Sequence, residues 1–148
     1  MLVAVEAWPL AAAVRHSLWA YPVLEVVHIA ALGTLFGSLL LLDLRLFGFG
    51  KAIAVPPLGR YCVRVALLAF VFAATSGLLM LAARATELVE NPVFQAKLVL
   101  IALAGVNALL FHKRNGLERH DGVARLQGAL SLVIWIGVIS AGRFIAYY

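Results

Sequence analysis

The feature that most constrains this chain is a set of four long apolar stretches that carry almost no charge. They span about residues 22–47, 60–84, 94–113 and 125–146. A helix needs roughly 20 mostly apolar residues to cross the hydrocarbon core of a bilayer, and each stretch is long enough. The period-two alternation of membrane β-strands is not seen. The sequence therefore predicts an all-α fold, a four-helix transmembrane bundle embedded in the lipid bilayer.

The composition supports the same class of protein. Hydrophobic residues make up 64% of the 148 residues and charged residues only 13%, whereas globular chains average about 45–50% and about 25%. The mean hydropathy of +1.01 excludes a soluble globular protein, and this balance also excludes a disordered chain. Cys62 is the single cysteine, which excludes an intrachain disulfide and argues against a structural zinc site. Because no linker is long, we expect a single transmembrane domain over residues 1–148.

The connections between the spans differ in charge, and this difference predicts an orientation. The second connection is balanced, whereas the first and third are basic. By the positive-inside rule the basic loops face the cytoplasm of a bacterial inner membrane, and both termini lie outside. The net charge of +5 is therefore interpreted as an orientation and lipid-contact signal, and no nucleic-acid partner is expected. The basic residues are Arg45, Lys51, Arg60 and Arg64 at the first connection and Lys113, Arg114, Arg119 and Arg125 at the third.

The segment before the first span is apolar but is interrupted by Pro9, Arg15 and His16. Trp8 and Trp19 are typical of the headgroup region of a membrane. We expect a short interfacial helix over about residues 10–20 on the outer face, the alternative being a frayed hydrophobic tail. A cleavable signal peptide is not expected, because residues 1–20 lack a basic start.

His28 is the leading candidate for chemistry, because an ionisable residue inside a spanning helix is costly and is a functional hypothesis by default. Gly33 and Gly37 follow as a small-residue pair, and helix bundles hold haem with an imidazole beside small residues. Glu25 lies one turn before His28 and could accept the other imidazole proton. The alternative is a neutral histidine that only hydrogen-bonds a neighbouring helix, with the glycines serving helix packing.

Depth in the membrane decides which side chains could share a metal with His28. His112 lies at the inner end of the third span, roughly 20 Å from His28 along the membrane normal. His112 is either a second candidate ligand, for a second haem near the inner surface, or only an interfacial residue. We favour one haem. The candidates at the level of His28 are His16, Met80 and Lys97, or His28 of a second subunit. Lys97 could instead pair with a haem propionate or Glu25, or extend to the surface.

Three further polar residues interrupt the spans. Asn107 is expected to hydrogen-bond a neighbouring helix. Asp43 and Arg45 lie two residues apart at the inner end of the first span, so they do not face each other. Each is expected to pair with another helix or to cap the inner surface.

The first span reads Glu25-Val-Val-His28, then Gly33 and Gly37, and ends in Leu-Asp-Leu-Arg45; the third opens with Lys97-Leu98. This pattern resembles a family of small, uncharacterised four-helix bacterial inner-membrane proteins. It is also distantly similar to the membrane haem-b protoporphyrinogen oxidase and copper-resistance D families at His28, Gly37, Arg45, Lys97 and Leu98. The resemblance implies a haem b site at His28. It does not imply porphyrinogen oxidation, because the stretch before the last span departs from the oxidase pattern, or copper transport, because the chain has only two methionines.

Three functions remain open. The first is a b-type cytochrome that moves electrons to or from a quinone or a partner protein, self-associating as a homo-oligomer. The sequence leaves uncertain whether this cytochrome would also be an enzyme, as a membrane oxidoreductase. The second is a non-enzymatic structural or assembly subunit of a membrane complex. The third is a metal or small-solute permease, which ranks last because the prolines sit in loops and helix ends instead of at the midplane.

Overall fold

The computed structural model describes residues 2–119 and 121–147, and within these ranges every regular element is a helix. The predicted all-α fold is confirmed: four helices are long and apolar enough to cross a membrane. They are α3 (Ala20–Leu46), α4 (Val55–Ala83), α6 (Pro92–Lys113) and α8 (Gly122–Phe144). Short helices flank or join them: α1 (Leu2–Glu6), α2 (Pro9–His16), α5 (Ala85–Glu90), α7 (Gly116–Arg119) and the 3-10 helix η1 (Ile145–Tyr147).

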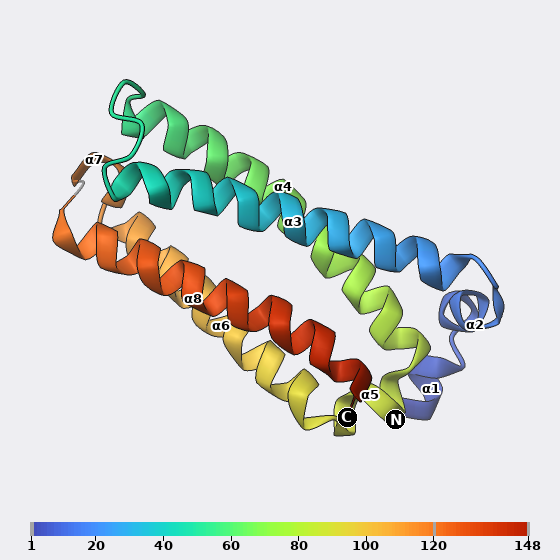
Figure 1. Cartoon of the computed structure of the whole chain (residues 1–148). Coiled ribbons are helices and arrows are strands. Elements are labelled where there is room, and N and C mark those ends of the chain that lie inside the picture. The colour runs from blue at the N-terminus through green and yellow to red at the C-terminus, as the bar shows by residue number, and fades with distance from the viewer. Residues whose placement is uncertain (1, 120, 148) are drawn as a thin grey trace.

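The long helices form two pairs. α3 packs along α4, α6 packs along α8, and contacts between α3 and α8 join the pairs. We call the end with α1, α2, α5 and both termini the terminal end, and the end with α7 and the α3–α4 connection the loop end (Figure 1). At the loop end α3 and α8 lie close together, and they diverge toward the terminal end (Figure 1).

The core of the bundle combines small side chains on α4 with larger ones on α3 and α8, such as Leu35 and Val138. Ala66, Ala69 and Ala73 recur at helical spacing, are almost fully buried, and continue to Ser76. Small residues let two helix backbones approach closely, which is the usual basis of helix packing where no water drives association. Large apolar side chains such as Leu67 point outward instead. An exposed apolar belt of this kind is what a lipid-facing surface requires.

The helix boundaries follow from local chemistry. Asn91 caps α6, because its side chain accepts hydrogen bonds from the backbone amides of Val93 at 2.9 Å and Phe94 at 3.2 Å. Asp121 caps α8 in the same way through the Ala124 amide, at 2.9 Å. The third long helix therefore begins at Pro92, two residues before the start of the span expected over residues 94–113.

Two expectations about boundaries were wrong. The second span was expected to begin at about residue 60, but α4 begins at Val55 and includes Pro56 and Pro57. Proline is tolerated in the first turn of a helix, because the amide it lacks would have no partner there. The interfacial helix expected at residues 10–20 is α2, which ends at His16; the next helix begins at Ala20.

Candidate functional site

The His28 side chain lies between α3 and α4, in the half of the bundle nearer the terminal end. Its Nδ1 is 2.8 Å from the Ala73 carbonyl oxygen and 3.1 Å from the Ser76 hydroxyl oxygen. The side chain is partly buried. Both hydrogen-bond partners belong to α4, so the imidazole joins the two helices of the first pair.

These partners determine which ring nitrogen carries the proton. A carbonyl oxygen can only accept, so Nδ1 must donate to Ala73. The single proton of the Ser76 hydroxyl is directed to the Phe72 carbonyl oxygen, 2.7 Å away, so Ser76 also accepts from Nδ1. With Nδ1 protonated, a neutral imidazole has its lone pair on Nε2. An Nδ1–H bonded to a backbone carbonyl is the arrangement that orients histidines as metal ligands.

The small residue beside the imidazole lies on α4. A Cβ atom placed on Gly77 would lie 3.1 Å from Cε1 of His28, so the ring packs directly against the α4 backbone. Gly33 and Gly37 have no atom within 4 Å of the position a Cβ would take. These two glycines therefore make no room for the ring; they present open backbone on another face of α3.

Three other residues expected at this level lie on three different helices, α2, α3 and α4. Glu25 is exposed, and among the described hydrogen bonds the ring is held by α4 and not by this carboxylate. Met80 is one turn beyond Ser76 on α4 and is partly buried. His16 is exposed at the last residue of α2.

Lys97 is the ionisable side chain of the second helix pair that lies nearest this region. Its Nζ would be 3.4 Å from a Cβ on Gly142, so the lysine lies against α8 in the interior of the pair. Within the described ranges no carboxylate forms an ion pair with Lys97. The terminal half therefore combines a lone-pair nitrogen with a partly buried cation.

His112 lies at the opposite end of the molecule. It is the penultimate residue of α6, at the loop end, and is exposed. Because α3 and α6 both run from the terminal end to the loop end, His28 and His112 are at different depths, as the sequence predicts. Across the described residues there is no group of three or more His, Cys, Asp or Glu side chains that could hold a metal ion.

The loop half has a polar interior of its own. Asn107 donates from Nδ2 to the Gln127 carbonyl oxygen at 2.9 Å, which confirms its expected role between helices. Asp43 is only 4% exposed, and its Oδ1 lies 2.7 Å from the position of a Cβ on Gly128 of α8. Its Oδ2 has no hydrogen-bond partner in the part of the chain that the structure describes. The pairing expected for Asp43 is therefore wrong, because the carboxylate is enclosed where α3 and α8 approach most closely.

The fold and these sites define a multi-pass membrane protein with four transmembrane helices. The chain belongs to the family of unknown function DUF6644, whose model matches residues 20–148. This match covers all four long helices and begins at the first residue of α3. It links the chain to a family that carries no assigned activity, and not to the haem-b oxidase or copper-resistance D families. No curated protein and no solved structure matches the chain.

Proposed function

We propose that this protein binds haem b through Nε2 of His28 and transfers electrons within a bacterial inner membrane, to or from a quinone or a partner protein. The observation that carries the proposal is the state of the imidazole. Two acceptors on α4 hold the proton on Nδ1, which leaves the Nε2 lone pair free for iron. A haem iron needs one or two such axial ligands, so a cluster of three metal-binding side chains is not required.

Lys97 supports the same proposal from the second helix pair. A cation inside a transmembrane bundle is costly unless a negative charge is nearby. The carboxylate-bearing edge of a haem would supply that charge, and Lys97 would bind and orient it while His28 holds the iron. In this arrangement Met80, His16 or the His28 of a second copy remain the candidates for the sixth ligand. When bound, the haem supplies a one-electron redox centre; the chain itself holds and orients it.

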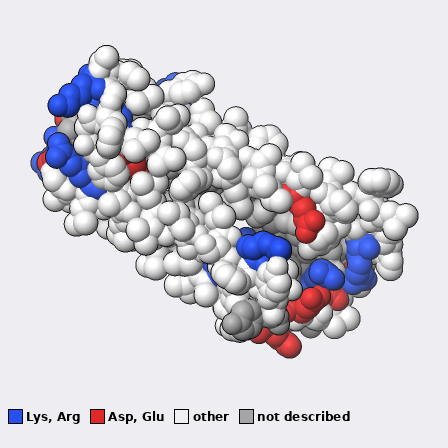
Figure 2. Space-filling view, in the orientation of Figure 1, with Lys and Arg blue, Asp and Glu red and all other residues white. Residues whose placement is uncertain are grey.

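The proposed orientation places both termini outside and the two basic connections in the cytoplasm. Most basic side chains gather at the loop end, whereas acidic and basic side chains are mixed at the terminal end (Figure 2). The cytoplasmic side of a multi-pass protein carries the excess of Lys and Arg, which supports this orientation. The His28 site would then lie nearer the outer surface.

A structural role in a membrane complex is the second candidate, and the same hydrogen bond favours it. The contact from Nδ1 to the Ala73 carbonyl already joins α3 to α4 without any cofactor. The two functions differ in what they require of the ring, because only haem binding uses Nε2.

The test compares His28→Asn with wild-type protein purified in detergent. The asparagine amide can still donate to the Ala73 carbonyl, but it offers no imidazole nitrogen to iron. We expect a Soret band and a reduced-minus-oxidised b-type spectrum in wild type, and loss of at least about nine tenths of the haem in His28→Asn. Size-exclusion chromatography checks that the variant still folds.

Three results would contradict the proposal. They are a colourless wild-type protein expressed with ample haem, full haem occupancy in His28→Asn, and equal haem loss in His112→Ala and His28→Asn. A colourless wild type whose His28→Ala variant unfolds more readily than His28→Asn would instead support the structural role.

A further inference from the structure

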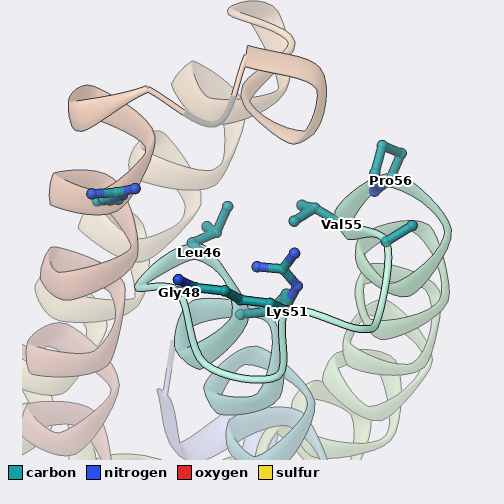
Figure 3. Close-up of a pocket in the computed structure, with 8 residues that line it drawn as sticks. Leu46, Gly48, Lys51, Val55 and Pro56 are labelled. Carbon is teal, nitrogen blue, oxygen red and sulfur yellow. The ribbon is translucent and has the colours of Figure 1, made fainter.

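The loop end holds a pocket that is far from His28 and serves no part of the haem proposal. It has a volume of about 480 Å³ and lies between the α3–α4 connection, the start of α4 and the start of α8. Figure 3 shows Leu46 and Val55 facing one another across it, with Lys51 on the connecting loop below. Leu46 and Val55 are almost fully buried and belong to the apolar cluster at this end of the bundle.

The charged side chains that line this pocket are all basic. They are Arg45 from α3, Lys51 from the loop and Arg125 from α8, and no carboxylate is among the described lining residues. The nearest acidic residue along α3 is Asp43, whose carboxylate is enclosed against Gly128 instead. Three cations from three segments, brought together around one hollow, repel one another unless an anion lies between them.

The Arg45 side chain is held in a defined position. Its Nε donates to the Ile53 carbonyl oxygen at 2.6 Å, which fastens the α3–α4 connection to α3. The terminal amino groups of the guanidinium are left for another acceptor. Arginine fixed in this way presents paired donors that match the geometry of a phosphate oxygen pair.

The beginning of α4 adds a second positive element to the same pocket. Val55 and Pro56 line it, and the helix that they open is 29 residues long. Ala54 gives the helix no side-chain cap, so the Val55 amide has no partner from that residue. The positive end of the α4 dipole therefore borders the hollow that the three cations surround.

We propose that this pocket binds a phosphate-bearing anion. The shared chemistry is a singly or doubly charged phosphate held by Arg45, Lys51 and Arg125, with an apolar wall formed by Leu46, Val55 and Pro56. Two sources can supply it: the headgroup of an anionic phospholipid, or free phosphate from the cytoplasm. Basic pockets between transmembrane helices at the inner surface are suited to anionic headgroups, and the apolar wall fits the glycerol and upper acyl carbons of a lipid.

The test uses the full-length protein in detergent, with thermal denaturation as the readout. Short-chain phosphatidylglycerol, short-chain phosphatidylcholine and inorganic phosphate are titrated separately at constant ionic strength. We expect saturable stabilisation by phosphatidylglycerol, by phosphate or by both, and weaker stabilisation by phosphatidylcholine because its choline cancels the charge. Stabilisation by the lipid alone identifies the headgroup as the source; stabilisation by phosphate at equal or lower concentration identifies the free anion.

Matched variants separate the pocket from general surface charge. Lys51→Gln with Arg125→Gln removes one lysine and one arginine from the pocket, and we expect the apparent Kd to rise about tenfold or more. Arg60→Gln with Lys113→Gln removes the same charge from loop-end positions that do not line the pocket, and should leave the Kd within about twofold. Equal weakening in both double variants, equal binding of both lipids, or no saturable stabilisation by any probe would overturn the proposal. Haem content is not a readout here, so failure of the haem proposal would leave this result unaffected.

Discussion

The two ends of this molecule share one apolar scaffold but differ in their net charge and in where their polar groups lie. At the terminal end the charges are balanced, and the polar groups that matter, His28 and Lys97, lie inside the bundle. At the loop end the charge is basic, and the cations surround an open pocket at the surface. An interior polar group must have a defined partner, because the bilayer offers no water to replace one. The two proposals therefore concern different ends of the molecule: haem binding at the terminal end and anion binding at the loop end.

The largest expected effect is the difference in haem content between variants of His28 and of His112, which lie at opposite ends of the molecule. We expect one haem per chain in wild type, near zero in His28→Ala, and an unchanged value in His112→Ala, because only His28 has a fixed Nδ1 partner. Pyridine haemochrome quantification per polypeptide measures this ratio. A value near two that falls to one in His112→Ala would place a second haem at the loop end and remove the distinction between the ends.

The orientation of the two ends is tested by reporters fused after Tyr148 and in the loop after Gly50. The charge difference leads us to expect activity from an external-side reporter at the C-terminus, and from a cytoplasmic reporter in the loop. The opposite pattern would place the basic pocket outside the cell. It would leave the geometry of both sites intact but reverse the source of their ligands.

The close approach of α3 and α8 at the loop end is tested with Gly128→Ala. The new Cβ would lie 2.7 Å from Oδ1 of Asp43, so the enclosed Asp43 side chain or the helices must shift, and we expect a loss of about 1–3 kcal/mol of stability. Gly37→Ala is the control, because no atom lies within 4 Å of its added Cβ. Equal melting temperatures for the two variants in detergent would show that Asp43 does not limit the approach.

The smallest effect concerns the terminal end, where α1 is fastened to α5. Glu6 accepts hydrogen bonds from the Thr86 hydroxyl at 2.6 Å and the Thr86 amide at 2.8 Å. These bonds, the hydroxyl first, lower the pKa of Glu6 from its ordinary value of 4.5. A lowered carboxyl pKa contributes stability that is present above the ordinary pKa and lost as the pH falls through the folded value.

We therefore expect the protection of the α1 amides, measured relative to their intrinsic exchange rate at each pH, to be constant at neutral pH and to fall only when the pH drops below 4.5. Glu6→Gln should show fast exchange in α1 at neutral pH, with the four long helices unchanged. Identical exchange in Glu6→Gln and wild type would mean that the contact with Thr86 does not hold α1 in place.

The long helices were predictable because length and hydropathy alone specify a membrane span. The start of α4 was not, since Pro56 and Pro57 read as loop residues until their place in the first turn is known. His28 could be singled out as an ionisable residue in an apolar run. Its partners could not, because the face of α3 that meets Ala73, Ser76 and Gly77 depends on how the two helices pack. The run of small residues on α4 was the available signal for that face.

The sequence shows the basic residues of the loop-end pocket but not that they line one pocket. The basic residues that flank the loops are plain, and they were interpreted as an orientation signal. One hollow is lined by Arg45, Lys51 and Arg125 because α3, the α3–α4 connection and α8 meet in space. The spacing of these residues along the chain does not show that meeting. The enclosed Asp43 was missed for the same reason, because its neighbour Gly128 is 85 positions further along the chain.

The unequal lengths of the two helix pairs have a consequence for the surrounding membrane. α3 and α4 have 27 and 29 residues, whereas α6 and α8 have 22 and 23. At 1.5 Å per residue the first pair is about 40–43 Å long and the second about 33–35 Å, against a hydrocarbon thickness of about 30 Å. The longer pair either extends further into the headgroup region or tilts more, and α3 diverges from α8 toward the terminal end in Figure 1. We therefore expect the helices, which diverge toward the terminal end, to displace more lipid from the leaflet at that end than from the opposite leaflet.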